Sequence, residues 1–191
     1  CFEMARSKNR TFGNIMGHVR DVKNLTSLTK WVQSQFDPKL SWDDVKRIKD
    51  WWGGKLILKG IMDPDDAKMA QKCGADALVV SNHGGRQLDG VNSSISVLPQ
   101  IRKAVSGIEV LFDGGISSGQ DILKAIALGA EGVMIGRSFV YGLSTKGKRG
   151  VINALEILNK ELDMTMALCG RRDIKDIGRD IIKDCPFFEK N

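Results

Sequence analysis

The sequence predicts an α/β fold built on a parallel β-sheet. Four short apolar segments alternate with segments of helical character, a pattern typical of parallel strands joined by helices that cover both faces of the sheet. Polar, glycine-rich segments follow the strands and do not precede them. Ligands bind beside the carboxyl ends of strands both in βα barrels and in doubly wound sheets. The pattern therefore predicts a binding site at that end of the sheet and leaves both topologies open.

The regular part of the chain begins at Ser41, which precedes two acids as an N-cap would and predicts a helix to about residue 52. Asp63 and Pro64 predict a second helix through Lys72, ended by Gly74. Strands are expected at 55–59, 77–81, 109–112 and 132–135. Further helices are expected at 97–105, 119–128, 151–168 and 174–182, with a polar loop over 82–96 and a basic loop over 146–149.

Residues 1–40 form a separate basic segment ahead of the sheet domain, which we place at 41–191. Six Lys or Arg residues stand against two acids between Cys1 and Phe36, with apolar side chains among them. The residues alone favour a surface loop with one helix over 25–36. A segment resting on an anionic lipid surface is the alternative.

Composition excludes several classes of protein. With 42% hydrophobic and 27% charged residues, the chain is typical of a globular domain, and no apolar run reaches the roughly 20 residues of a spanning helix. The net charge of +6 comes without basic runs interleaved with aromatics, so no nucleic-acid partner is expected. Four scattered cysteines and two histidines predict reduced thiols and no metal site.

The loop after the second expected strand carries the strongest chemical signal. His83 stands where an imidazole can exchange protons near neutral pH, and Arg86 offers a planar fork that suits a carboxylate. The paired glycines between them allow a ligand to approach the backbone closely. The alternative is a polar turn whose histidine is only hydrogen-bonded.

The next two strands are each followed by a turn that suits a phosphate. Residues 113–119 combine glycines and hydroxyls at a helix start, and Gly136 and Arg137 follow the last strand. Two ordinary strand–helix turns are the alternative reading. Lys59, at the end of the first strand, could stabilise negative charge on a ligand, although taken alone it is more typical of a surface lysine.

Together these segments resemble the FMN-dependent α-hydroxy-acid oxidase and dehydrogenase family. Residues 81–89 match the family's histidine signature without a gap, and 58–61 match the segment of its flavin-contacting lysine. Residues 113–119 and 129–137 match its flavin-phosphate segments, while 36–38, 41–42 and 59–67 look closest to bacterial L-lactate dehydrogenases.

The resemblance implies the C-terminal half of a TIM (β/α)8 barrel, strands five to eight, that binds FMN and oxidises an L-2-hydroxy acid, with L-lactate to pyruvate the first choice. His83 would accept the proton, Arg86 would bind the substrate carboxylate, and Lys59 would stabilise the reduced flavin. The remaining cofactor contacts would come from Ser81, Asp113, Gly114, Gly115, Ser117, Gly136 and Arg137. Relatives commonly carry Arg where this chain has Ser117, so weaker phosphate binding is expected.

The resemblance also implies that some residues of the family's site, and half of its barrel, are not contained in this sequence. The aspartate that orients the histidine and the second carboxylate-binding arginine belong to the family's first half. Four strands of a barrel leave two open edges and an uncovered inner face, so we expect association with a complementary half, with a second copy, or within a longer polypeptide.

The resemblance also implies a quinone or another electron acceptor, which the sequence does not identify. It favours a cytoplasmic protein held peripherally on the inner face of the cell membrane through residues 1–40. The competing hypotheses are an inactive fragment and another phosphate-binding barrel such as an inosine-monophosphate-dehydrogenase-like enzyme, which the element from His83 to Arg86 argues against.

Overall fold

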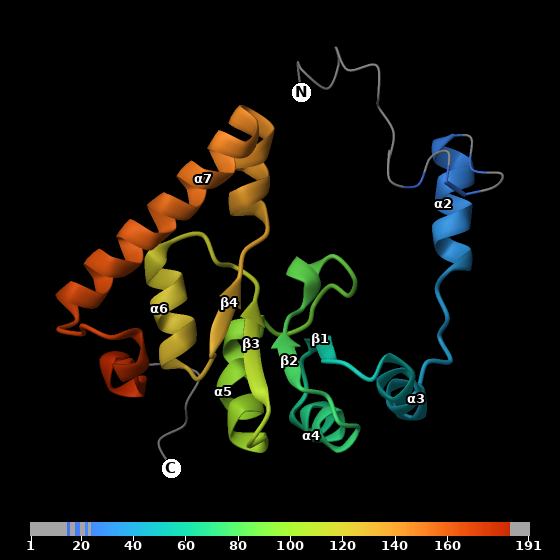
Figure 1. Cartoon of the computed structure of the whole chain (residues 1–191), viewed down its shortest axis with the longest axis horizontal. Coiled ribbons are helices and arrows are strands. Elements are labelled where there is room, and N and C mark those ends of the chain that lie inside the picture. Colours follow the sequence, from blue (N-terminus) through green and yellow to red (C-terminus); the bar gives the residue numbers. More distant parts are fainter. Residues whose placement is uncertain (1–14, 16–17, 20–21, 23, 184–191) are drawn as a thin grey trace. The chain divides into compact units, whose positions relative to one another are not determined.

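The computed structural model describes residues 15, 18–19, 22 and 24–183. The chain divides into two compact units, Cys1–Ser41 and Trp42–Asn191. No helix among the described residues has both the length and the apolar character that crossing a bilayer requires. The sheet and the predicted site residues all lie in the second unit (Figure 1).

The first unit contains helix α2 (Leu25–Ser34), as the sequence predicts. Asn24 caps it: its side chain accepts from the backbone N–H of Ser27, and the Ser27 hydroxyl accepts from the backbone N–H of Asn24 in return. This reciprocal capping box satisfies donors that the first helical turn leaves unpaired. The helix ends two residues before the predicted limit, and Phe36 beyond it is 78% exposed.

The second unit is built on four parallel strands in the order β1-β2-β3-β4. The strands are β1 (Ile57–Ile61), β2 (Ala77–Val80), β3 (Glu109–Asp113) and β4 (Gly132–Met134). A doubly wound sheet reverses its strand order at a switch point, whereas consecutive strands that remain neighbours build a barrel. The observed order is therefore that of a partial βα barrel.

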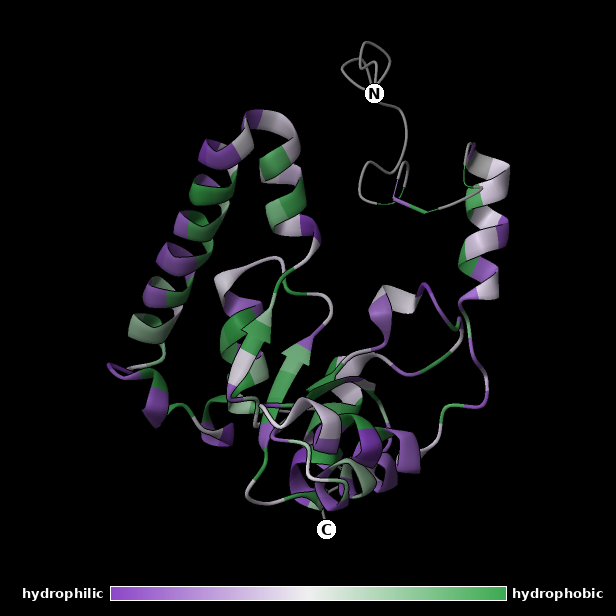
Figure 2. Ribbon diagram, turned by 45° about the vertical axis from the view of Figure 1, so that its right-hand side comes forward, coloured by the Kyte–Doolittle hydropathy of each residue, from purple (hydrophilic) through white to green (hydrophobic). Residues whose placement is uncertain are grey.

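Three crossover helices pack on one face of this sheet: α4 (Pro64–Lys72), α5 (Ser94–Ala104) and α6 (Gly119–Ala127). Alternate strand residues such as Leu78, Val80, Val110 and Phe112 are buried beneath them and form the core. Figure 2 shows that the strands are predominantly hydrophobic. The expectation of helices on both faces is wrong for the described part of the chain. Successive right-handed crossovers between neighbouring strands place their helices on the same side, and the other face carries both polar and apolar side chains, such as Asp113 and its register partner Met134.

Several predicted boundaries need correction. Helix α3 (Trp42–Trp52) is confirmed, but α5 begins at Ser94, so its first turn was wrongly assigned to the polar loop. Helix α7 (Arg137–Leu168) consists of two helical arms separated at Lys146 and Gly147, which leave helical geometry inside the basic loop predicted at 146–149, and its first arm was not predicted. The predicted tail helix is two short 3-10 segments, η2 (Ile174–Asp176) and η3 (Arg179–Ile181).

Asp76 ties α3 and the start of β1 to β2. Its carboxylate accepts from Lys49 Nζ at 2.5 Å, Lys55 Nζ at 2.8 Å and the backbone N–H of Leu56 at 2.8 Å. The hydrogen bonds from Lys49 and Lys55 hold the pKa of Asp76 well below its ordinary value, so the carboxylate stays ionised throughout the neutral range. This network sets the amino-terminal end of the sheet, opposite the candidate site.

Candidate active site

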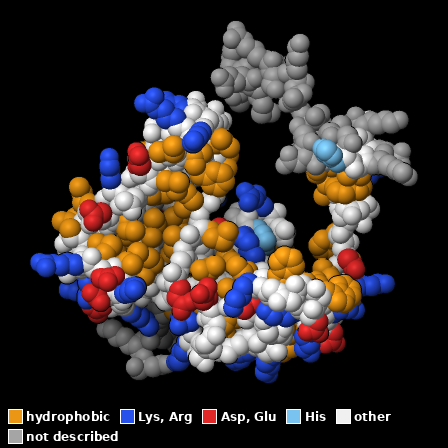
Figure 3. Space-filling view, in the orientation of Figure 1, with side chains coloured by type: hydrophobic (Ala, Val, Ile, Leu, Met, Phe, Trp, Pro, Cys, Tyr) orange, Lys and Arg blue, Asp and Glu red, His pale blue; other side chains and the backbone are white. Residues whose placement is uncertain are grey.

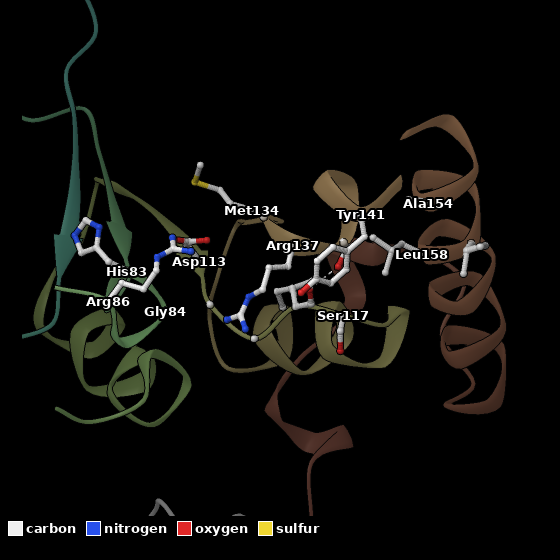
Figure 4. Close-up of a pocket in the computed structure, with 16 residues that line it drawn as sticks. His83, Gly84, Arg86, Asp113, Ser117, Met134, Arg137, Tyr141, Ala154 and Leu158 are labelled. Carbon is white, nitrogen blue, oxygen red and sulfur yellow. Dashed lines mark hydrogen bonds between the residues drawn. The ribbon is translucent and has the colours of Figure 1, made fainter. Parts of the chain in front are cut away.

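A cavity of about 610 Å³ opens at the carboxyl ends of β3 and β4, between the loop after β2 and helix α7 (Figure 4). Its volume lies in the range of about 300–1,000 Å³ that is usual for small-molecule sites. Eight of the ten predicted site residues line it: His83, Arg86, Asp113, Gly114, Gly115, Ser117, Gly136 and Arg137. The other two, Lys59 and Ser81, are hydrogen-bonded to each other next to the cavity wall.

The loop after β2 places His83 and Arg86 on one side of the cavity. His83 begins the short 3-10 segment η1 (His83–Gly85), and its backbone N–H donates to Ser81 Oγ at 3.2 Å. The imidazole lies against Gly60 of β1, where a Cβ atom would come within 2.7 Å of His83 Nε2. Gly60 has φ +99° and stands where the β1–β2 register shifts, so the bulge makes room for the ring.

Arg86 is exposed and forms no ion pair within 4.0 Å among the described residues. Its guanidinium is thus available to a carboxylate, which it can bind through two parallel N–H donors. Figure 4 shows Arg86 beside His83 and away from α7. The two side chains predicted to meet the substrate therefore come from one loop and one end of the cavity.

Lys59, Ser81 and Asp113 form a compact polar cluster across β1, β2 and β3. Lys59 Nζ lies 2.7 Å from Asp113 Oδ2 and donates to Ser81 Oγ at 3.1 Å, while the Ser81 hydroxyl donates to Asp113 Oδ2 at 2.6 Å. Burial opposes ionisation of Asp113, but the hydrogen bonds from Lys59 and Ser81 outweigh it and hold its pKa below the ordinary value. The cluster therefore presents an ionised carboxylate to the cavity at neutral pH.

The two glycine-rich turns form another part of the cavity wall, and the Arg137 guanidinium reaches back toward the His83 loop, where a Cβ at Gly84 would lie 3.5 Å from its Nη2. Gly114 and Gly115 have φ +129° and +74°, and a Cβ atom at Gly115 or Gly136 would meet nothing within 4 Å. Arg137 begins α7, is exposed, and has no ion-pair partner within 4.0 Å among residues 24–183. A backbone free of side chains beside an unpaired cation suits an anionic group.

Ser117 also lines the cavity, but both of its hydrogen-bond donors are already used within the chain. Its backbone N–H and hydroxyl both donate to Asp121 Oδ2, at 3.0 and 3.1 Å. Ser118 and Asp121 form the capping box of α6, so one carboxylate satisfies donors from two consecutive serines. Without a rearrangement of Asp121, Ser117 has little left to offer an anion.

The remaining lining residues were not candidates from the sequence. They are mainly apolar and come largely from α7: Gly84, Ile116, Met134, Ser138, Tyr141, Ala154, Ile157 and Leu158. The helical period over 151–168 predicts a helix but does not say which of its residues face a cavity. Tyr141 was missed because the first arm of α7 was not predicted as a helix.

The fold and the cavity together define a class of protein. It is a βα-barrel protein in which the loops after the strands combine glycine-rich turns suited to an anion with a histidine and an arginine in one cavity. The family model described as FMN-dependent dehydrogenase matches residues 3–184, and the chain belongs to this family. The alternative of an inosine-monophosphate-dehydrogenase-like barrel is thereby set aside.

Individual relatives agree with the family match. The chain is 47% identical over 180 residues to the L-lactate dehydrogenase of Actinobacillus pleuropneumoniae serotype 5b, which covers 94% of this chain and 47% of that protein. Among solved structures it is similar to the monotopic membrane protein (S)-mandelate dehydrogenase, with a TM-score of 0.81 and 36% identity over 87% of this chain and 44% of that one.

A mandelate oxidase variant solved with a monooxide FMN adduct gives a TM-score of 0.71 and 43% identity, covering 73% of this chain and 45% of that one. The chain thus spans about half the length of the relatives it matches.

Proposed function

We propose that this chain contributes the catalytic half of an enzyme that uses FMN to oxidise an L-2-hydroxy acid to a 2-keto acid, with L-lactate to pyruvate as the reaction. The observation that supports this most directly is a single cavity lined both by His83 and Arg86 and by Gly115, Gly136 and Arg137. The family and the 47% identity to an L-lactate dehydrogenase support the choice of substrate.

The residues present fit FMN. The glycine turns and the unpaired Arg137 guanidinium suit its phosphate, and the ionised Asp113 carboxylate can accept hydrogen bonds from ribityl hydroxyls. Lys59 and Ser81 would meet the ring system, and Gly114 would complete the phosphate site. Ser117 would join it only through a rearrangement of Asp121, which now accepts both of its donors. When bound, FMN supplies a two-electron acceptor that no side chain can replace.

The substrate would be held and deprotonated by the loop after β2. Arg86 would hold its carboxylate through paired N–H donors, which orients the hydroxyl-bearing carbon. Oxidation of the alcohol to a ketone removes two electrons and two protons, and the His83 imidazole would accept one of these protons. The backbone N–H of His83 donates to Ser81 Oγ, and this bond leaves the imidazole ring available to accept the proton.

The test is reduction of bound flavin by L-lactate. The chain is loaded with FMN, mixed with L-lactate without oxygen, and followed by visible absorbance. We expect bleaching in the wild type, at least a hundredfold slower bleaching in His83→Gln with FMN still bound, and normal bleaching in His18→Gln, which changes the chain's other histidine. A loaded wild type that L-lactate does not bleach would favour the inactive-fragment hypothesis, and rapid bleaching of His83→Gln would contradict the role given to His83.

We further propose that the protein lies peripherally on the inner face of the cell membrane and passes electrons to a quinone. Residues 1–40 would make the contact: Val32, Phe36 and Leu40 are 51%, 78% and 70% exposed, and the segment is basic. Flotation with vesicles of anionic phospholipid at low salt should carry the chain upward. Recovery of all protein from the bottom fraction would contradict this contact.

The open sheet suggests that the chain works in association with a complementary half-barrel or with a second copy of itself.

A further inference from the structure

The backbone at His83 has a left-handed conformation, which the surrounding contacts must stabilise. His83 has φ +56°, the one positive value among the described residues other than glycine, and Gly84 and Gly85 follow with +67° and +71°. Side chains other than glycine rarely adopt this left-handed region, and where they do the surrounding contacts impose it. The direction of the imidazole therefore depends on the contacts that fix this loop.

Asn82, immediately before His83, makes two of those contacts with one side chain. Its Oδ1 accepts from the backbone N–H of Gly84 at 3.0 Å, and its Nδ2 donates to the backbone carbonyl of Asn92 at 3.3 Å. The two partners differ in kind, one donor and one acceptor, and together they fix the orientation of the amide. The backbone carbonyl of Asn82 also accepts from Gly85 N–H at 3.0 Å.

These contacts connect the beginning of the loop between β2 and α5, at residues 82–84, with its end at Asn92. The bond to Gly84 closes a turn around His83, as Asn side chains often do in left-handed turns. The bond to Asn92 ties that turn to the segment entering α5. Asn82 does not line the cavity, so its contacts act on the loop that carries the imidazole and do not depend on a ligand.

We propose that Asn82 is a positioning residue for His83: by capping Gly84 and tethering the turn to Asn92, it holds the imidazole against Gly60 in the orientation needed to accept a proton from the substrate. The proposal rests on the proposed function for the role of His83. Its structural part, the placement of the imidazole, stands on the contacts alone.

The test reads the position of the imidazole directly in the chain without cofactor. Since a Cβ on Gly60 would lie 2.7 Å from His83 Nε2, the ring protons of His83 should give nuclear Overhauser effects to the Gly60 α-protons. With two histidines in the chain, His18→Gln assigns the signals. The variants are Asn82→Ala, Asn82→Asp and, as a matched control, Asn92→Ala, which keeps the backbone carbonyl that Asn82 uses.

We expect the His83–Gly60 effects in the wild type and in Asn92→Ala, and their loss in Asn82→Ala. They should weaken in Asn82→Asp, which retains an acceptor for Gly84 N–H but loses the donor to the Asn92 carbonyl. Unchanged amide signals of the buried Leu78 and Val110 would show that the sheet is intact. With FMN and L-lactate, Asn82→Ala should slow flavin reduction at least tenfold while its FMN dissociation constant stays within twofold of the wild type.

Three results would overturn the proposal: wild-type effects in Asn82→Ala, wild-type effects in Asn82→Asp, or their loss in Asn92→Ala. A wild type that L-lactate does not reduce would count against the proposed function and leave the comparison of imidazole positions unaffected.

Discussion

At the scale of single residues, the site depends on small side chains as much as on reactive ones. The sequence identifies His83 from its place after a strand, but it gives no indication that this residue has a left-handed backbone or that Gly60 lies under its ring. Both features arise from contacts between residues far apart in the chain. Local patterns such as helix caps and strand ends were predictable, whereas the bulge in β1 that makes room for the imidazole was not.

Replacing Gly60 with Ala tests this arrangement. A Cβ here meets the imidazole and also demands a φ of +99°, so the variant should lose about 1–3 kcal/mol of unfolding free energy and reduce bound flavin at least tenfold more slowly. Gly107→Ala is the control, because its φ of +75° is similarly strained while a Cβ there would meet nothing within 4 Å. Urea denaturation and stopped-flow absorbance measure the two effects, and a Gly60→Ala variant reduced at the wild-type rate would contradict the account.

At the scale of elements, helices with clear caps were predicted well and α7 was not. Asp63 caps α4 and Ser118 caps α6, and both helices appear where these residues place them. The two arms of α7 are separated at Lys146 and Gly147, inside the predicted basic loop, and the second arm contains the helix predicted over 151–168. The first arm, between Arg137 and the loop, was not predicted as a helix, and Tyr141 was missed with it.

The edge strands lead to a prediction about association. β1 and β4 each have one neighbour in the sheet, and Ile57 and Met134 on them are 53% and 41% exposed. Further hydrophobic side chains gather over α7 and the adjacent α6 (Figure 3), among them Leu155 and Ile157, which are 50% and 56% exposed. Open parallel edges next to exposed apolar side chains favour pairing with another chain.

Equilibrium sedimentation of the chain should therefore give a weight-average mass that rises with concentration above 21.0 kDa. Ile57→Lys should lower that mass by blocking the edge of β1, whereas Ile174→Lys, at a similarly exposed isoleucine in η2, should leave it unchanged. A stable monomer at all concentrations would argue against edge pairing.

At the scale of the whole molecule, the strand pattern predicted a parallel sheet with its topology open, and the resemblance to the FMN-dependent family implied the partial barrel. The predicted residues make up nearly all of the polar side of the cavity. Residues at the ends of strands were placed correctly because parallel strands bring their carboxyl ends to one edge of the sheet. The apolar wall was not predicted, since it comes from a helix whose direction is set by tertiary packing. The sequence also did not predict that the Ser117 backbone N–H and hydroxyl donate to Asp121.

This pairing leaves Arg137 as the main charged contact for a phosphate, which makes the central claim of a single FMN cavity directly testable. The decisive measurement is the equilibrium affinity of the chain for FMN compared with riboflavin, which lacks the phosphate, by quenching of flavin fluorescence. We expect FMN to bind at least tenfold more tightly, Arg137→Met to abolish that preference, and Arg149→Met, outside the cavity, to preserve it. Equal affinities for the two flavins, or a preference that Arg137→Met leaves intact, would contradict the account.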